Sequence, residues 1–334
     1  MSAATPDSHE RSSTDGPETR PESATAETGP LISSAMTGPD LSPTEPADDD
    51  DTDADLIRLL APPTDPAALG RLAHYEIIRR VGRGGMGRVF QAFDTALQRN
   101  VAVKILAAPL AASPMARRRF LREARAAAAL NHPNIVTVHA VGEFGSIPYL
   151  VMEYVGGGSL SVRLRASAPL PPGEVIRLGA QVAHGLAAAH AQGLVHRDIK
   201  PANLLLDDAT GRIKITDFGL AQATLDPSES ASPGQTAGTP SFLAPELLVG
   251  VPATSRSDLF SLGCVLYAMV DGGSPFRGTQ FLEVATRLAS DTPVSLERLD
   301  PRIPPALAAL VAGLLEKSPE ARHPGTAAEV AARL

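Results

Sequence analysis

Three short segments alternate between apolar and polar residues with the period of a β-strand. They are YEIIRRV (75–81), RVFQAFD (88–94) and VAVKIL (101–106), and a period of two places successive side chains on opposite faces of a sheet. The first two segments flank the glycine-rich stretch GRGGMG, so this order predicts a hairpin. Residues 132–160 predict two more strands, joined by a Gly-containing turn and followed by a glycine-rich link.

The rest of the folded part has the pattern of helices. Residues 115–132 combine helix-forming composition with apolar residues at three- and four-residue intervals, which is the spacing of one helix face. Three later segments also predict helices: 174–193, 257–270 and 306–317. Strands first and helices second, with a glycine-rich link between them, predict an α+β fold of two lobes with a cleft.

Residues 1–70 show neither pattern. They hold fifteen acidic residues and three arginines, are rich in Ser, Thr, Pro and Ala, and include the run DDDDTDAD at 48–55. Such a composition buries too little apolar surface to offset the entropy of ordering the chain. We therefore predict that 1–70 is a disordered, acidic Ser/Thr/Pro-rich tail. The short apolar stretch LIRLLAPP (56–63) is the part that could dock on the folded body.

Composition excludes several classes of protein. The chain has 334 residues, 43% hydrophobic and 20% charged, which is average for a globular protein. A single cysteine, Cys264, rules out a disulfide framework and fits a reducing compartment. The start of the chain lacks an apolar segment, and no apolar run reaches the roughly 18 residues of a spanning helix. We expect a cytoplasmic chain without a membrane span, and the net charge of +5 outside the tail gives no reason to expect nucleic acid.

The glycine-rich stretch indicates a phosphate-binding hairpin. Gly82, Gly84 and Gly87 form G-x-G-x-x-G, a weak signal by itself because a dinucleotide-binding fold or an ordinary turn shows it too. A dinucleotide site needs a helix after the glycines, whereas here a strand follows. The Gly-Lys-Ser/Thr of a Walker loop is absent. A flexible hairpin whose backbone N–H groups lie over phosphates remains.

Two charged residues of the first lobe have ordinary and functional interpretations. Lys104 ends the apolar strand VAVK, where a lysine is more often a solvated strand end. Glu123 lies in the helix of 115–132 and could be a plain surface charge. An ion pair between Lys104 on the strand and Glu123 on the helix, however, would direct the Lys104 ammonium group toward phosphate oxygens.

The stretch LVHRDIKPANLLL (194–206) places charges between two apolar runs, where they are costly unless they are paired or do chemistry. Asp198 can accept a hydroxyl proton, and Lys200 can neutralise a transferring phosphoryl group. Asn203 and Asp217, the latter in the sequence DFG, offer oxygen atoms that suit magnesium. Arg197, beside the base, could receive an anion.

In this order the motifs resemble those of the eukaryotic-like Ser/Thr protein kinases of bacteria. The resemblance covers 75–334 and includes VGRGGMGRVF, VAVK, LVMEYVGGGSL, HRDIKPAN, DFG, GTPSFLAPE and SDLFSLG. It implies a protein kinase fold with a small β-rich N-lobe (75–152), a hinge (153–158) and a larger helical C-lobe (159–334), with the nucleotide cleft between the lobes.

The resemblance also implies roles for single residues, with ATP and Mg²⁺ as cofactors. Lys104 is expected to contact the α- and β-phosphates and to pair with Glu123. Asp198 is expected to orient and deprotonate the substrate hydroxyl, and Lys200 to meet the γ-phosphate. The expected metal ligands are Asn203 and Asp217. The expected nucleotide-contacting positions are Val81, Gly82, Gly84, Gly87, Val89, Ala102, Lys104, Glu153, Val155 and Leu205.

Other motif residues are expected to be structural. Asp258 should fix the backbone of the catalytic loop, and Glu246 should pair with Arg322. We expect His196 and Phe218 to pack rather than react. The remaining structural expectations are Cys264 in the core, Met152 as gatekeeper and Ala127 at a spine position that usually holds a larger residue.

The implied function is transfer of the ATP γ-phosphate to Ser or Thr of protein substrates, in signalling. Lys200 and Thr239 favour Ser/Thr over Tyr. Two alternatives stay open: a nucleotide-binding pseudokinase, and a small-molecule kinase of similar fold. Autophosphorylation of the loop 220–243, through a possible transient dimer, is expected to switch the enzyme. The hydroxyls of that loop are Thr224, Ser228, Ser230, Ser232, Thr236, Thr239 and Ser241, of which Ser232 and Thr236 are the preferred candidates.

Overall fold

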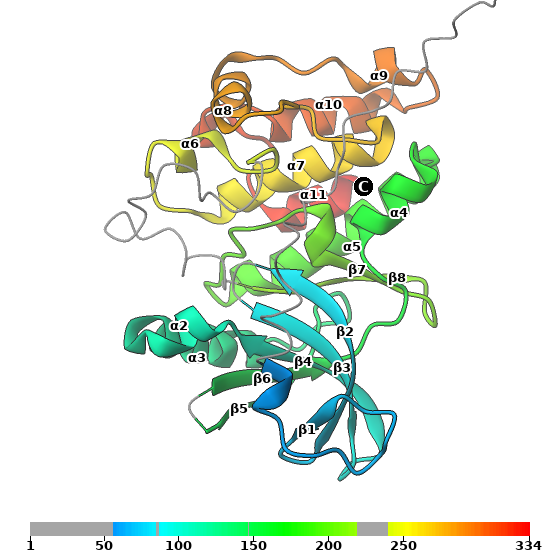
Figure 1. Cartoon of the computed structure of the whole chain (residues 1–334). Coiled ribbons are helices and arrows are strands. Elements are labelled where there is room, and N and C mark those ends of the chain that lie inside the picture. Colours follow the sequence, from blue (N-terminus) through cyan, green and yellow to red (C-terminus); the bar gives the residue numbers. More distant parts are fainter. Residues whose placement is uncertain (1–55, 85–86, 146, 219–239) are drawn as a thin grey trace, which may run out of the picture. The chain divides into compact units, whose positions relative to one another are not determined.

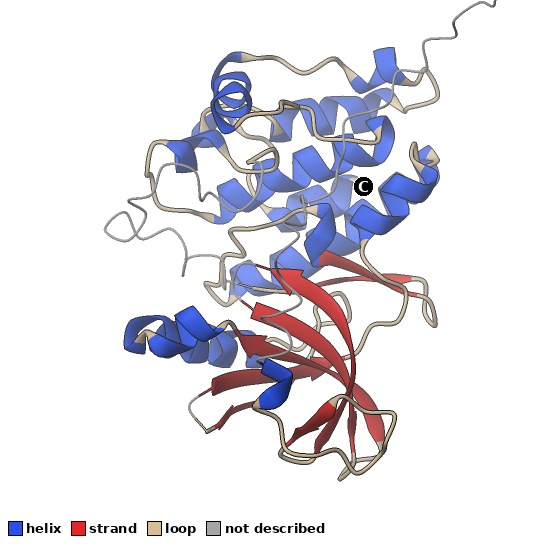
Figure 2. Ribbon diagram, in the orientation of Figure 1, coloured by secondary structure: helices blue, strands red, loops and turns tan. Residues whose placement is uncertain are grey.

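The structure is a computed structural model, and it describes residues 56–84, 87–145, 147–218 and 240–334. All of these belong to one unit of the chain, Leu41–Leu334. Figures 1 and 2 show a β-rich lobe and a helical lobe within it. The predicted α+β organisation is therefore confirmed.

The N-lobe contains an antiparallel sheet of six strands. Their order is β1-β2-β3-β4-β6-β5, and their bounds are β1 (Gly70–Leu72), β2 (Tyr75–Gly84), β3 (Gly87–Asp94), β4 (Arg99–Leu106), β5 (Val138–Phe144) and β6 (Ile147–Glu153). The five strands β2 to β6 were predicted, and the hairpin of β2 and β3 is present. Two helices, α2 (Ala108–Ala112) and α3 (Pro114–Ala128), lie beside the sheet (Figure 1).

The residues at the start of α3 explain why the helix begins there. Pro114 occupies the first turn, where its missing N–H costs nothing, and the Ser113 hydroxyl accepts a hydrogen bond from the Ala116 N–H. Phe120 and Ala124 of α3 are buried with Leu106 and other apolar residues of the sheet. This packing fixes the helix on the sheet.

Apolar residues of one face of the sheet form a cluster that we call the outer cluster. It consists of Leu56, Leu72, Tyr75, Ile77, Phe90, Ala92, Val101, Val103, Ile105 and Val151. The neighbouring residues of β4, Ala102 and Lys104, alternate with Val101, Val103 and Ile105 and therefore point to the opposite face. That opposite face belongs to the candidate site.

The C-lobe is mainly helical, with a small two-stranded sheet. Its α-helices are α4 (Leu160–Ser167), α5 (Pro172–Ala191), α6 (Pro245–Leu248), α7 (Ser255–Asp271), α8 (Phe281–Ser290), α9 (Leu296–Leu299), α10 (Pro305–Leu314) and α11 (Ala327–Arg333). The 3₁₀ turns η1 (Pro201–Asn203) and η3 (Pro319–Ala321) and the strands β7 (Leu204–Asp207) and β8 (Arg212–Ile215) complete it. Within the described parts, no helix is both long and apolar enough to cross a membrane.

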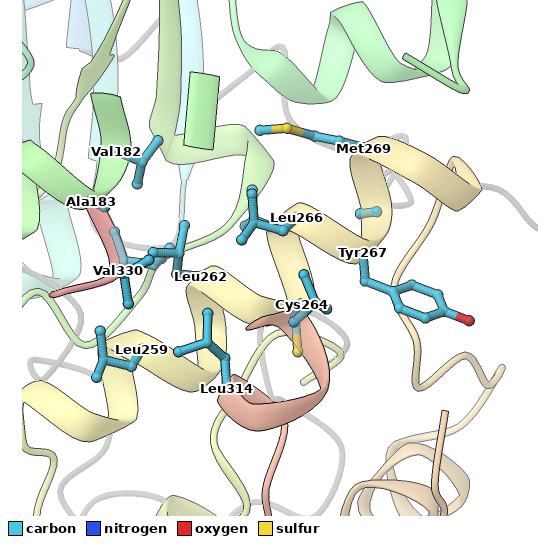
Figure 3. Packing of buried hydrophobic residues seen from close by; sticks show 14 of the residues in the cluster. Val182, Ala183, Leu259, Leu262, Cys264, Leu266, Tyr267, Met269, Leu314 and Val330 are labelled. Atoms are coloured by element: carbon cyan, nitrogen blue, oxygen red, sulfur yellow. The ribbon is translucent and has the colours of Figure 1, made fainter. Parts of the chain in front are cut away.

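Helix α7 is the centre of the C-lobe. Every residue from Ser257 to Val270 is buried, and Figure 3 shows its side chains packed against residues of α5, α10 and α11. A helix that is apolar on all sides has no face for solvent, so its neighbours must surround it. Cys264 lies in this core, as predicted, and burial raises the pKa of its thiol.

A buried ion pair joins α6 to the segment after α10. Arg322 donates from its two terminal nitrogens to the two carboxylate oxygens of Glu246 at 2.7 and 2.6 Å, and Ser257 donates a further hydrogen bond to Glu246. The predicted Glu246–Arg322 pair is confirmed. Burial alone would raise the pKa of Glu246, but the hydrogen bonds from Arg322 and Ser257 hold this pKa below its usual value.

The predicted tail of 1–70 is wrong for its last fifteen residues. Leu56 is buried in the outer cluster, and Leu60 packs against that cluster. Ala61 forms an antiparallel β-bridge with Arg71 of β1, and β1 pairs with β2. These contacts attach the segment to the edge of the sheet. The apolar stretch 56–63 thus docks, because its leucines cover an apolar face that would otherwise meet water. Residues 1–55 lie outside the described part.

Substitution of Leu56 tests this docking. Leu56→Ala should lower the free energy of unfolding of the full chain by about 2 kcal/mol or more, since it removes a buried side chain. The matched control is Leu59→Ala, because Leu59 is 56% exposed, and it should change stability by less than about 0.5 kcal/mol. Urea unfolding measures both. Equal, small losses for the two variants would show that the segment contributes nothing to the fold.

Candidate active site

Lys104 is a buried lysine whose counter-charge comes from the other lobe. It lies in β4 opposite Val89 of β3 and is 6% exposed. Its ammonium nitrogen is 2.7 Å from Oδ1 of Asp217, which follows β8. A buried ammonium without a partner would be costly, so this ion pair accounts for the position of Lys104 and links the two lobes.

Asp217 is held in its ionised form by the same contact. Burial by itself would raise the pKa of Asp217, but the charge and hydrogen bond of Lys104, with smaller effects of His196 and Lys200, keep this pKa below its usual value. Its backbone has a φ of 64°, an uncommon conformation for a non-glycine residue. Such strain persists only where surrounding contacts fix the residue.

The expected pair between Lys104 and Glu123 is not formed. Glu123 is buried in α3, and its carboxylate forms an ion pair with Arg119, one helical turn away, at 3.7 Å. Its Oε1 accepts no hydrogen bond. Burial therefore raises the pKa of Glu123, despite the nearby charges of Arg119, Arg197 and Arg122. The spacing along the chain places Lys104 and Glu123 on neighbouring elements, but Asp217 competes successfully for the single ammonium group.

The catalytic loop is fixed by one buried carboxylate, that of Asp258 in α7. It accepts hydrogen bonds from the backbone N–H groups of His196 and Arg197, both at 2.8 Å, and from the ring of His190 at 2.8 Å. Arg197 has a φ of 73°, a strained conformation that these bonds support. The predicted structural role of Asp258 is confirmed.

His196 connects the catalytic loop to the segment that leads to Asp217. Its Nε2 donates to the carbonyl oxygen of Thr216 at 2.8 Å, and its Nδ1 accepts from the Asp198 N–H at 3.2 Å. Both ring nitrogens are therefore occupied by hydrogen bonds within the protein. The ring also packs edge-on against Phe218, with centroids 4.7 Å apart. His196 and Phe218 are thus packing residues, as predicted.

Asp198 has the surroundings of a base that can reach a substrate. Its Oδ2 accepts hydrogen bonds from the Asn203 amide and the Lys200 ammonium, both at 2.8 Å. Its side chain remains 34% exposed, so an incoming hydroxyl group can approach it. The two cationic or amide donors orient the carboxylate from one side.

Asn203 and Asp217 fit a magnesium site of the kind that shares its ion with phosphates. The amide nitrogen of Asn203 donates to both the carbonyl and the carboxylate of Asp198, which leaves its amide oxygen as the atom for a cation. The described residues contain no group of three His, Cys, Asp or Glu side chains that could hold a metal alone. Mg²⁺ suits such a site, because it often takes only one or two protein oxygens and completes its shell with phosphates and water.

An apolar cluster across the two lobes gathers several of the residues that are expected to contact adenine. Ala102, Val136 and Met152 are buried in it, and the partly buried residues packed against it are Val89, Tyr154, Val155 and Leu205. This arrangement brings together the predicted Val89, Ala102, Val155 and Leu205. The Glu153 N–H is taken by the Thr137 carbonyl, so Glu153 can offer adenine only its carbonyl oxygen.

The hairpin above this cluster requires glycine at one position in particular. A Cβ atom on Gly87 would lie 2.0 Å from the carbonyl oxygen of Ile105, a distance that only a shift of the backbone could relieve. On Gly82 the same atom would make ordinary contact with Val89. Val81 is 39% exposed. Gly84 ends β2.

The small residue at position 127 leaves room behind Met152. A cavity of about 20 Å³, lined by Ala127, Met152 and Phe218 among others, lies there. This volume holds about one water molecule. Ala127, which was expected at a position that usually holds a larger residue, is one of the residues that line this cavity.

The sequence analysis did not single out Lys214 in β8. Its ammonium nitrogen lies 2.9 Å from a carboxylate oxygen of Glu153 in β6, so this second ion pair also joins the lobes. The signal was a lysine inside the apolar strand IKIT, because a lysine in a buried strand needs a counter-charge. The preferred phosphorylation positions Ser232 and Thr236 lie outside the described residues.

Comparison with protein families identifies residues 75–332 as a match to the model described as "Protein kinase domain". Among curated proteins, the chain is 41% identical over 264 residues to the serine/threonine-protein kinase PknB of Mycobacterium leprae, covering 78% of this chain and 42% of that protein. It is 40% identical over 250 residues to PrkC of Bacillus subtilis, covering 75% and 38%. The chain spans less than half the length of these relatives.

Solved structures show the same fold. The kinase domain of Mycobacterium tuberculosis PknI aligns with a TM-score of 0.61 at 31% identity, covering 78% of this chain and 95% of that one. Rad53 1–466 in complex with AMP-PNP aligns with a TM-score of 0.65 at 28% identity, covering 77% and 64%. The predicted two-lobed kinase fold is confirmed.

Substitution of Glu123 tests whether burial destabilises its ionised carboxylate. The raised pKa means that the proton on Glu123 stabilises the fold fully below the unfolded-state value of about 4.3, and that this stabilisation is lost as the pH rises through the folded-state pKa. Because Gln resembles the protonated form, Glu123→Gln should raise the free energy of unfolding at pH 7, by up to about 1 kcal/mol. Chemical denaturation between pH 4 and 8 measures the difference.

The matched control is Glu143→Gln, which removes an exposed carboxylate paired with Arg117 at 2.8 Å. It should lower stability by no more than about 1 kcal/mol. A marked loss of stability in Glu123→Gln at pH 7 would contradict the account, because it would mean that the carboxylate forms a stabilising ion pair.

Proposed function

The chain belongs to the protein kinase family, and from this premise we propose that it transfers the γ-phosphate of ATP to Ser or Thr hydroxyls of protein substrates. The observation that carries the proposal is the position of Asp198, oriented by Asn203 and Lys200 and open to an incoming hydroxyl group. The names of the relatives, which are serine/threonine-protein kinases, support the choice of acceptor.

Asp198 would perform the proton transfer. Its carboxylate accepts the proton of the substrate hydroxyl while that oxygen bonds to the γ-phosphorus, and the bond from phosphorus to the bridging oxygen of ADP breaks. Lys200 lies on the same carboxylate, and its charge can neutralise the phosphoryl group in transit. Positioning and charge neutralisation, rather than a covalent enzyme intermediate, lower the barrier.

Asn203 and Asp217 would hold magnesium through their side-chain oxygens. When bound there, the ion would screen the negative charge of the phosphates. Lys104 is expected to contact the α- and β-phosphates, yet its ammonium group lies on Asp217. Nucleotide binding would therefore exchange one partner of Lys104 for another, and the liganded arrangement would differ from the described one by at least this ion pair.

Regulation by autophosphorylation is a further part of the proposal. Phosphate on Ser232 or Thr236 would bring nearly two negative charges close to Arg197, and pairing with this arginine would order the loop. The support is the Ser/Thr-rich sequence of 220–243 together with Arg197 beside the base. The transient dimer, the role in signalling and the cytoplasmic location remain predictions from the sequence.

A transfer assay with labelled ATP and a generic protein acceptor tests the activity. Asp198→Asn should lower turnover by about 10²- to 10⁴-fold, the usual contribution of a positioned base, while the fold persists. The nearby exposed Asp208 provides the matched control, and Asp208→Asn should leave turnover within about twofold.

Each other outcome contradicts a different part of the proposal. Near wild-type transfer by Asp198→Asn would remove the base assignment. Nucleotide binding without transfer in the wild-type protein would indicate a pseudokinase. Transfer to a small molecule but to no protein would identify the third class of function.

A further inference from the structure

Three arginines share one face of the hairpin formed by β2 and β3. Arg83 of β2 lies directly opposite Arg88 of β3, and Arg80 lies opposite Phe90. Residues directly opposite in a ladder point to the same face, as do residues two apart in a strand, such as Arg88 and Phe90. We call this surface, made of Arg80, Arg83 and Arg88, the arginine face.

The arginine face concentrates positive charge on one surface of the hairpin. Like charges directly opposite in adjacent strands destabilise a sheet, and here Arg83 and Arg88 form such a pair. Arg80 and Arg83 are exposed and Arg88 is partly exposed, so an anionic segment can reach all three. Each of the three also takes part in an interaction with another group of the chain.

The arginine face continues the outer face of the sheet rather than the nucleotide side. Arg88 is opposite Ile105 of β4, and Phe90 is opposite Val103. Phe90, Val103 and Ile105 all belong to the outer cluster. Lys104, by contrast, is opposite Val89 and points to the candidate active site. The arginines and the nucleotide thus lie on opposite sides of the hairpin.

The chain itself contains acidic residues close in sequence to the outer cluster. Leu56 is buried in the outer cluster, and the residues directly before it, 48–55, contain six aspartates in DDDDTDAD. Eight extended residues span about 26 Å, whereas Phe90 and Arg88 are about 7 Å apart along their strand. Because Leu56 and Phe90 belong to the same cluster, a segment of this length is long enough to reach the arginine face from Leu56.

We propose that residues 48–55 bind across the arginine face of the same chain. Six negative charges meet three positive ones, and the short tether to Leu56 gives an effective concentration in the millimolar range. The contact should be strong at low ionic strength and weaken in 1 M salt, where the screening length falls from about 10 Å to 3 Å. This inference does not rest on the proposed activity.

The contact has a consequence for the other side of the hairpin. Gly82 and Val89 are cross-strand partners, and both face the candidate nucleotide site. A segment bound to Arg80, Arg83 and Arg88 restrains the two strands that carry them. The acidic segment would therefore reduce the local opening of the pairing between β2 and β3.

Hydrogen exchange of the full chain tests the effect on the hairpin. The six substitutions D48N, D49N, D50N, D51N, D53N and D55N should make the amides of 80–90 exchange about three- to tenfold faster, because several exposed ion pairs are lost together. The matched control removes six acidic charges further from the hairpin: D7N, E10Q, D15N, E18Q, E22Q and E27Q. It should leave these amides unchanged. Equal acceleration in both variants would show a general effect of net charge and overturn the proposal.

A spin label on the tail tests the contact from the other side. Ala54→Cys can be labelled selectively, because the native Cys264 is buried. The label should move slowly in the wild-type background and rapidly in R80Q/R83Q/R88Q. The control R118Q/R122Q/R125Q removes three exposed arginines of α3 and should leave the label slow.

Three results would overturn the proposal. The label could be equally mobile in all three backgrounds, or become mobile in the α3 control as well. Its slow component could also vanish on dilution of the protein, which would identify a second copy of the chain as the occupant.

Discussion

The carboxylate of Asp258 is the contact on which the catalytic centre depends. It is buried in α7, the helix that the rest of the C-lobe surrounds, and it accepts the backbone N–H groups of His196 and Arg197. Because Arg197 has a strained φ, the loop would not keep this shape without such bonds. The ring of His196 in turn forms hydrogen bonds with the Thr216 carbonyl and the Asp198 N–H, and so helps to fix both residues. One buried acid thus fixes the two segments that carry the proposed chemistry.

Among the described residues, two ion pairs join the lobes, and both involve residues close to the expected nucleotide site. Lys104 of β4 pairs with Asp217, and Lys214 of β8 pairs with Glu153 at the hinge. The first pair occupies the groups expected to meet phosphates and magnesium. Groups that would bind the ligand therefore pair with each other, and this contact offsets the cost of burying the Lys104 ammonium group. Because Lys104 pairs with Asp217, the buried carboxylate of Glu123 has, within the described parts of the chain, only the longer ion pair with Arg119, and its Oε1 accepts no hydrogen bond.

The sequence predicted the elements and the motif residues because periodicity and spacing are local properties. It did not predict the partner of Lys104, since two carboxylates compete for one ammonium group and their distances depend on how α3 and the lobes pack. Lys214 escaped notice for the same reason. The docking of 56–72 was underestimated because acidic composition dominated the whole segment, although the leucines of LIRLL had the right character. At Gly70 the requirement for glycine comes from contact with Leu60, which no local pattern contains.

The most direct test of the account is the turnover of an Asp258→Asn variant that remains folded. An amide group would replace one acceptor oxygen by a donor facing backbone N–H groups, so the loop should lose its fixed position. We expect kcat to fall by about 100-fold through misplacement of Asp198, while KM for ATP changes by less than about threefold because Asp258 does not touch the nucleotide site. The amides of His196 and Arg197 should also exchange faster. Wild-type kcat with unchanged exchange at these two amides would contradict the claim that this carboxylate organises the site.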